Sequence, residues 1–207
     1  MKKDSDISPT EDKVKPKERI LEASLTLFVE KGYFNTNIPD ISKLSSCSVG
    51  SIYHHFVNKE EIAKELYQKG IDQFREALAD EFEDTLDLKT ILRNMVITFL
   101  TFAETHATLS RYLWLSRHEE FLTDKISKPT MVGFDNLGRK LTKLIKNGIR
   151  SGEIPDIKAE IFWCIVFGIP QSYIRDWLEG YAIKLPHTVA PQLANACWAG
   201  LQGAVKK

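Results

Sequence analysis

The chain has 207 residues, of which 43% are hydrophobic, 10% aromatic and 27% charged. This balance is typical of a folded globular protein and excludes a disordered chain. Because 28 Lys and Arg residues balance 28 Asp and Glu residues, the composition excludes a uniformly basic, histone-like coat for nucleic acid, while a locally basic face is compatible with it.

The hydrophobic pattern along the chain predicts helices throughout. Residues 1–16 are polar and charged and predict a flexible arm. From Lys17 to Lys31-Gly32, apolar residues recur at three- and four-residue spacing, which predicts a first helix, and two short helices follow it. Further helices are predicted over residues 60–82, 88–103, 109–121, 129–149, 157–178 and 189–205. No stretch alternates with a period of two residues, so we expect an all-α fold of about nine helices, with a small N-terminal part and a larger C-terminal part.

The two short helices lie in segment 33–61, where three residues suited to cap a helix follow one another closely. These residues are Asn37, Ser48 and Asn58, and the two asparagines are each followed three positions later by an acidic residue. Two short capped helices separated by Ser45-Ser46-Cys47 predict a helix-turn-helix. The expected shared core consists of Leu21, Phe28, Ile41, Leu44, Ile52 and Phe56.

The second short helix, residues 49–55, lies in a stretch that favours contact with a polyanion. From residue 41 to residue 59 the only charged side chains are Lys43 and Lys59. A phosphate-facing surface needs such a local absence of carboxylates more than it needs a high overall charge. The sequence therefore predicts that this helix faces DNA.

Individual residues in this stretch suit the same role. Gly50 has no side chain and allows a close approach of the backbone. Tyr53 and His54 offer hydrogen-bond donors that suit phosphate oxygens. The helix that begins at Asn58-Lys59 directs free N–H groups outward beside a lysine, which predicts a phosphate anchor.

The run Ser48–Phe56, SVGSIYHHF, is followed closely by Lys59-Glu60. Further residues of the same pattern upstream are Ile20-Leu21, Phe28, Gly32-Tyr33, Thr36-Asn37-Ile38 and Ile41. With these residues the chain resembles the TetR/AcrR family of transcriptional regulators over about residues 17–65. The remaining two-thirds of the chain resembles the family in helical character and length alone.

The resemblance implies an N-terminal three-helix helix-turn-helix DNA-binding domain over residues 17–77 and a larger helical effector-binding and dimerisation domain over residues 78–207. It places Val49 and Ser51 at base edges in the major groove. The phosphate contacts that it implies are Thr36, Lys43, Ser48, Tyr53, His54 and Lys59. Ser46 stands where the family usually has Gly in the turn, and we expect an uncommon backbone conformation there.

Several residues have a catalytic or metal-binding alternative that the sequence disfavours. His54 and His55 point about 100° apart on a helix and have no third ligand nearby, so no metal site is expected. Cys47 suits a small apolar plug of the turn better than a redox sensor. The motif His118-Glu119-Glu120 lacks the second histidine of a zinc protease, and no other catalytic motif is present. We therefore expect no enzymatic activity and no cofactor.

Cysteine usage and hydropathy indicate the compartment. Cys47, Cys164 and Cys197 form no CxxC pair and predict reduced, mostly buried thiols without disulfides. The longest stretch without a charge, residues 161–174, is shorter than the roughly 20 apolar residues of a bilayer span. The N-terminus lacks the apolar region of a signal peptide. We therefore expect a cytoplasmic protein with no membrane partner.

Two features of the C-terminal part favour binding of a small molecule. Pro170 removes the N–H that would bond the Val166 carbonyl, so a kink is expected at residues 166–168. The surrounding helices are rich in aromatic residues, and the family's larger domain usually binds an effector, which favours a cavity for an apolar or aromatic molecule. A fully packed core is the alternative. The candidate lining residues are Phe99, Phe102, His106, Tyr112, Trp114, Phe134 and Phe167.

The last predicted helix, residues 189–205, carries small residues at near-helical spacing, which allow another helix to approach closely. Together with the preceding helix it would form half of a four-helix dimer interface, as the family generally builds. The candidate interface residues are Ile165, Ile169, Tyr173, Trp177, Ala194, Cys197, Trp198 and Leu201.

The sequence thus predicts a homodimeric DNA-binding regulator, a repressor that a small apolar or aromatic effector releases from a pseudo-palindromic operator of double-stranded DNA. Two other functions stay open. One is an all-α protein-interaction module whose helix-turn-helix surface binds a protein, and the other is a small helical enzyme, although a nucleophile–base pair is missing. A steep loss of DNA affinity with added salt would distinguish the regulator from the interaction module.

Overall fold

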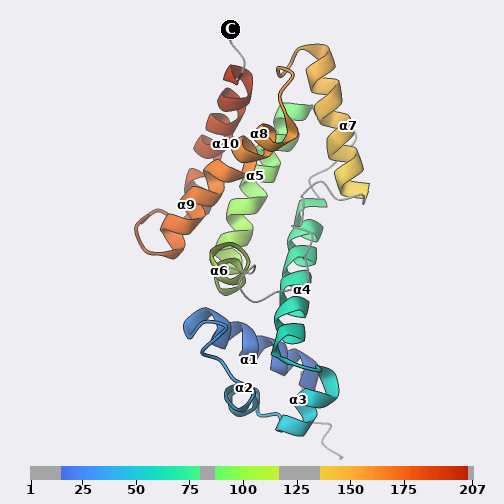
Figure 1. Cartoon of the computed structure of the whole chain (residues 1–207). Helices are drawn as coiled ribbons and strands as arrows, with labels where there is room; N and C mark the ends of the chain where they lie inside the picture. Colours follow the sequence, from blue (N-terminus) through green and yellow to red (C-terminus); the bar gives the residue numbers. More distant parts are fainter. Residues whose placement is uncertain (1–14, 80–86, 117–135, 205–207) are drawn as a thin grey trace, which may run out of the picture. The chain divides into compact units, whose positions relative to one another are not determined.

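The computed structural model describes residues 15–79, 87–116 and 136–204, and all regular structure in these ranges is helical (Figure 1). The helices are α1 Pro16–Glu30, α2 Ile38–Ser45, α3 Val49–His55, α4 Lys59–Ala79, α5 Leu88–Thr105, α6 Ala107–Leu115, α7 Asn136–Ser151, α8 Ala159–Trp163, the π-helical turn η2 Cys164–Gly168, α9 Ile169–Leu178 and α10 Pro186–Gly203. Because α8, η2 and α9 follow one another without a break, the described ranges contain nine helical runs. The predicted all-α fold is confirmed. Most of the predicted arm, the motif at residues 118–120 and Phe134 lie outside the described residues.

The chain folds into two compact units, Met1–Ile62 and Ala63–Lys207, and α4 runs from one into the other. We refer to them as the N-terminal unit and the C-terminal unit. The domain boundary predicted from the sequence, between residues 77 and 78, stays a prediction. In the described ranges, no helix combines the length and the apolar character that crossing a lipid bilayer requires.

The N-terminal unit packs α1, α2 and α3 around a small core. The confirmed core residues, each at most 4% exposed, are Leu21, Phe28, Ile41, Ile52 and Phe56. The prediction for Leu44 was wrong, because its side chain is 51% exposed. Ile41 and Ser45 stand one turn apart on the buried stripe of α2, and Leu44 lies beside that stripe.

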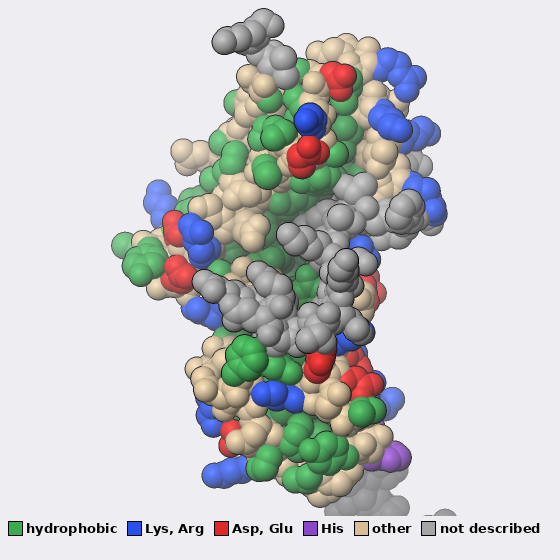
Figure 2. All heavy atoms as spheres, in the orientation of Figure 1, with side chains coloured by type: hydrophobic (Ala, Val, Ile, Leu, Met, Phe, Trp, Pro, Cys, Tyr) green, Lys and Arg blue, Asp and Glu red, His purple; other side chains and the backbone are tan. Residues whose placement is uncertain are grey.

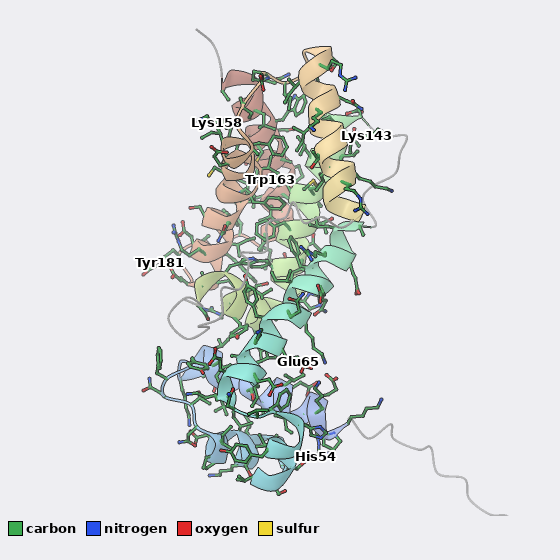
Figure 3. The ribbon with its side chains drawn as sticks, turned by 45° about the vertical axis from the view of Figure 1, so that its right-hand side comes forward. His54, Glu65, Lys143, Lys158, Trp163 and Tyr181 are labelled. Atoms are coloured by element: carbon green, nitrogen blue, oxygen red, sulfur yellow. The ribbon has the colours of Figure 1, made fainter. Side chains whose placement is uncertain are left out.

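The C-terminal unit is built around α5 and α10, which pack side by side along their length (Figure 1). One stripe of α10 is buried, and its members are Pro186, Ala190, Ala194, Cys197 and Leu201. The small side chains of this stripe allow α10 to lie close to α5, whose own residues Met95, Val96 and Phe99 are buried. The outer side of α7 carries cations such as Lys143 (Figure 3).

The helix interruption predicted at Pro170 takes the form of the π-helical turn η2. Pro170 is the second residue of α9 and has no N–H to donate to the Val166 carbonyl. The Cys197 thiol of α10 donates to that carbonyl instead, with a sulfur–oxygen distance of 3.9 Å. The wider π-helical turn and the thiol donor from α10 thus accommodate the proline without ending the helix.

Candidate nucleic-acid interface

The two short helices begin at the capping residues that the sequence predicts. The Asn37 Oδ1 atom accepts a hydrogen bond from the Asp40 N–H at 2.9 Å, and the Ser48 Oγ atom accepts one from the Ser51 N–H at 3.1 Å. These caps satisfy amides that a short helix leaves without an internal partner. They set the first residue of α3 at Val49.

The turn between α2 and α3 contains the uncommon backbone conformation that the sequence predicts. Ser46 ends α2 with φ 53° and ψ 32°, in the left-handed region. A residue with a Cβ atom pays about 1 kcal/mol or more to adopt this conformation. Cys47 follows as a buried plug, and its thiol approaches the carbonyls of Ser45 and Pro16 at 3.6 and 3.8 Å.

Helix α3 is attached by one side and presents the other to solvent. Ile52 is fully buried within the unit, while Val49 is 41% and Tyr53 is 54% exposed. His54 is exposed as well and lies at the outer surface of the helix (Figure 3). Ser51 is half-buried. The face therefore combines an apolar group, a phenol, an imidazole and a hydroxyl.

Gly50 leaves the backbone of α3 open at this face. A Cβ atom added there would have only the Ser48 Oγ atom within 4 Å, at 3.9 Å. The backbone at Gly50 is helical and needs no glycine. Nothing inside the unit therefore requires glycine at this position, and the open backbone is a property of the surface itself.

The electrostatic surroundings of α3 favour an anion. Asp40, the last carboxylate before α3, pairs with Lys31 at 3.6 Å. Lys43, in the last turn of α2, is exposed. Figure 2 shows hydrophobic side chains gathered at the end of the unit that carries α2 and α3. The outward face thus combines apolar and neutral polar groups, and the cation of Lys43 is nearby.

The prediction that Thr36 contacts a phosphate was wrong. Its side chain is buried, and its hydroxyl lies 2.9 Å from the Gly32 carbonyl and 3.2 Å from the Leu27 carbonyl. Leu27 lies in the last turn of α1 and Gly32 in the turn after it, and the Leu27 carbonyl also accepts the Lys31 N–H at 2.9 Å. Thr36 therefore closes the end of α1 instead of facing a ligand.

The Lys59 side chain contacts the loop between α1 and α2. Its ammonium group donates to the carbonyls of Tyr33 and Thr36 at 2.7 and 2.8 Å and lies 4.1 Å from the centre of the Tyr33 ring. Burial lowers the pKa of Lys59, and burial together with the charge of Glu60 raises the pKa of Tyr33. Lys59 therefore clamps the loop between α1 and α2, and its predicted contact with a phosphate stays a prediction.

At the start of α4, where the sequence predicts a phosphate anchor, two hydrogen bonds close the cap. The Glu61 N–H donates to Asn58 Oδ1 at 2.9 Å, and the Glu61 carboxylate accepts the N–H of Val57. The cap that the sequence predicts at Asn58 is therefore formed, and it occupies the Glu61 amide, while the phosphate anchor stays a prediction. The N-terminal unit thus exposes the outward face of α3, and Lys43 is exposed as well.

Comparison with known proteins identifies this arrangement. Residues 20–66, which span α1 to α3 and the start of α4, match the model described as "Bacterial regulatory proteins, tetR family". The chain belongs to the TetR family. It is a DNA-binding transcriptional regulator of the helix-turn-helix type, as the sequence predicts, and its family consists of regulators.

Relatives of this TetR-family chain match it along most of its length. The HTH-type transcriptional regulator TtgR of Pseudomonas putida is 27% identical over 177 residues, which cover 81% of this chain and 82% of TtgR. A TetR family regulator from Marinobacter aquaeolei shares the fold with a TM-score of 0.76 at 20% identity, over 90% of this chain and 95% of that one. FadR from Bacillus subtilis, solved in complex with stearoyl-CoA, has a TM-score of 0.68 at 17% identity, over 91% and 99% of the two chains.

In the TetR-family chain, four of the predicted effector residues come together in one aromatic cluster. Its members are Phe74, Phe99, Phe102, Trp114, Trp163 and Phe167, with neighbouring ring centres 4.8–6.0 Å apart. The sequence prediction missed Phe74 and Trp163. Trp163 lies one turn before Phe167, and this four-residue spacing was the available signal.

Two further predicted effector residues are held by hydrogen bonds. The Tyr112 hydroxyl is buried and donates to the Ala63 carbonyl at 2.8 Å. The His106 ring stacks on Phe102 at 4.5 Å, and its Nε2 atom lies 3.0 Å from the Gln73 amide nitrogen. Ring stacking and a hydrogen bond thus hold the His106 ring. Among the described residues, no group of three His, Cys, Asp or Glu side chains could hold a metal ion.

The predicted dimer residues differ in their exposure. Ala194, Cys197 and Leu201 were wrong, because they lie on the buried stripe of α10; burial also raises the pKa of the Cys197 thiol to about 11. Ile169 is exposed. The half-buried members are Ile165, Tyr173, Trp177 and Trp198. Ile161 and Cys164 of the α8–η2 run and Ala196 and Ala199 of α10 are also exposed.

Proposed function

We propose that the chain is a homodimeric repressor whose two α3 helices enter successive major grooves of a pseudo-palindromic operator, about 34–36 Å apart. The observation that carries this proposal is the outward face of α3, which is exposed, free of carboxylates and open at Gly50. A protein seated across two successive grooves hinders access to the promoter without further contacts. This supports repression as the outcome of binding.

Each exposed residue of the face has a role in this proposal. Val49 and Ser51, in the first turn of α3, are assigned to base edges, and the open backbone at Gly50 to close approach. Contacts to phosphates position the protein without reading sequence. The residues assigned to phosphates are Lys43, Ser48, Tyr53 and His54.

The proposed dimer uses the outer side of the α8–α9 run and of α10. Ile161 and Ile169 are large apolar residues exposed on the first run, and Ala196 and Ala199 are exposed on α10. Exposed apolar groups beside small residues suit close helix packing against a second copy. Ile169→Glu should yield monomers in sedimentation experiments, whereas Lys143→Glu on α7 should leave the dimer intact.

The proposed effector is a small apolar or aromatic molecule that enters the aromatic cluster of the C-terminal unit. Trp114 is only half-buried, so the cluster reaches the surface of the described residues. The complex of FadR with stearoyl-CoA supports an effector with a long apolar part. The effector would weaken operator binding because it binds more tightly to the operator-free conformation. The free energy of this weakening cannot exceed the difference between the effector's binding free energies for the operator-free and the operator-bound conformations.

The experiment that tests DNA binding pairs two exposed tyrosines. An operator is selected from random duplexes with the full chain, and affinity is measured by fluorescence anisotropy at several salt concentrations. Tyr53→Ala should weaken binding to all duplexes, operator or not, by about tenfold, the loss of one good polar contact. Tyr181→Ala, in the C-terminal unit and 79% exposed (Figure 3), is the matched control and should bind normally.

Two results would overturn the proposal. Equal affinities for both variants would remove α3 from the interface. An affinity for duplex DNA that does not fall steeply with added salt would instead favour the protein-interaction module, because neutralised phosphates release counterions on binding.

A further inference from the structure

The outward face of α3 lacks the side chains that usually read a base pair through paired hydrogen bonds. From Leu44 to Val57 the chain has no Arg, Lys, Asn, Gln, Asp or Glu. Paired bonds to guanine use Arg or Lys, paired bonds to adenine use Asn or Gln, and cytosine donates to Asp or Glu. Helix α3 therefore needs another way to distinguish base pairs.

What α3 presents at its start is an apolar group. Val49 is the first residue of the helix and is substantially exposed, and Tyr53 lies one turn further along the same side. Gly50, next to Val49, adds no side chain that would keep the helix away from a groove. The apolar group that a base pair displays in the major groove is the C5-methyl group of thymine.

Val49 is also held rigidly. A β-branched side chain keeps essentially one χ1 rotamer in a helix, so the two methyl groups of Val49 have a fixed position. The Ser48 hydroxyl, which caps α3 through the Ser51 N–H, fixes the backbone on either side of Val49. A rigid apolar group loses little conformational entropy when it meets a methyl group, and both then leave water.

We propose that Val49 reads the C5-methyl group of one thymine in each half-site of the operator. At that position the sequence preference arises from apolar contact, and Ser51 and Tyr53 supply single polar contacts around it. This inference rests on the proposed DNA-binding role of α3.

The test removes the methyl group from the DNA and the valine from the protein. Each thymine of the selected half-site is replaced in turn by deoxyuridine, which lacks only the C5-methyl group, and the dissociation constant of the full chain is measured by fluorescence anisotropy. We expect one position per half-site where the replacement weakens binding about fourfold, the contribution of one buried methyl group. Val49→Ala should bind the thymine and uracil duplexes equally.

The matched control is Val57→Ala. Val57 follows α3, is 78% exposed and is the same residue type. This variant should keep the fourfold difference between thymine and uracil, because the inference gives Val57 no base contact. Loss of the difference in Val57→Ala as well would mean that the effect is not specific to Val49.

The results separate this inference from the proposed function. If the full chain binds no duplex in preference to unrelated DNA, the proposed function fails. If the operator binds but no uracil replacement weakens it, or if Val49→Ala keeps the fourfold loss, the thymine reading is wrong while operator binding stands.

Discussion

The N-terminal and C-terminal units place their candidate functional side chains in opposite environments. In the N-terminal unit, Val49 and Tyr53 are exposed and pack against little of the protein. In the C-terminal unit, Phe99 and Phe167 are buried and face each other with ring centres 5.4 Å apart. Binding and stability are therefore separable in the first unit, while in the second the same side chains serve both.

The contrast has a consequence for regulation. A ligand of the N-terminal unit meets a surface that the fold has already completed, so binding requires little rearrangement. A ligand of the aromatic cluster has to displace rings that contact one another, and the packing that it changes extends to α5 and η2. A packed core moves between discrete arrangements rather than deforming continuously, which is a suitable basis for a switch.

The largest effect is expected when a ring of the aromatic cluster is truncated. Phe99→Ala should lower the free energy of unfolding by about 3–5 kcal/mol, because the ring is buried against Phe74, Trp114 and Phe167. Urea unfolding followed by tryptophan fluorescence measures it, since all four tryptophans lie in the C-terminal unit. Tyr53→Ala is the control and should change the free energy of unfolding by less than about 0.5 kcal/mol. Similar losses in both variants would contradict the distinction between the units.

The next largest effect is expected at Gly50. Gly50→Ala should keep or slightly raise the melting temperature, because the added methyl group has open space and alanine favours a helix. The same methyl group should weaken operator binding by about tenfold or more, since it stands where the backbone approaches DNA. Gly203→Ala, at an equally open position of α10, should bind the operator normally. Undiminished operator binding by Gly50→Ala would show that DNA does not approach this backbone.

A smaller effect on stability is expected at Ser46, in the turn between α2 and α3. Ser46→Gly should raise the free energy of unfolding of the N-terminal unit by about 0.5–1 kcal/mol, because glycine adopts the left-handed conformation without a Cβ clash. Calorimetry of the full chain measures this gain. Ser48→Gly, which removes the cap of α3, should give no gain. A loss of stability in Ser46→Gly would mean that the serine side chain supports the turn.

The smallest effect concerns an ion pair that joins α5 to the start of α10. Burial raises the pKa of Glu104, but hydrogen bonds from the side chain and the backbone N–H of His187, together with its charge, outweigh burial and lower the pKa below the ordinary 4.5. The pair therefore stabilises the C-terminal unit above about pH 4.5 and loses this contribution as the pH falls through the lowered pKa. Glu104→Gln should cost a few tenths of a kcal/mol at neutral pH and reduce the acid sensitivity of urea unfolding below pH 5. An unchanged acid sensitivity would rule out this contribution.

Local chemistry explains why much of the N-terminal unit could be predicted from the sequence. A cap at Ser48 requires only a hydroxyl two or three residues before a free amide. The uncommon backbone conformation of Ser46 could be predicted because a serine stands at a turn position that usually has glycine. These signals lie within a few residues of each other. The burial of Ile41, Ile52 and Phe56 could be predicted from helical periodicity in the same way.

Other features depend on contacts between distant parts of the chain, which helical periodicity does not contain. Lys59 donates hydrogen bonds to carbonyls that lie 23 and 26 residues earlier in the chain, and no local sequence pattern predicts these bonds. Helix α10 has small residues on two sides, so the sequence does not tell whether Ala194 or Ala196 faces α5. The packing partner decides this, and it buries Ala194.

The most direct test of the central claim, that the outward face of α3 meets DNA, is site-specific photo-crosslinking. A photoreactive phenylalanine analogue is introduced at position 53 or, as a control, at position 181, and each protein is irradiated on its selected operator. If this claim holds, crosslinks form from position 53 to both half-sites, one helical turn apart, and none form from position 181. Crosslinks absent from position 53 on an occupied operator would contradict it.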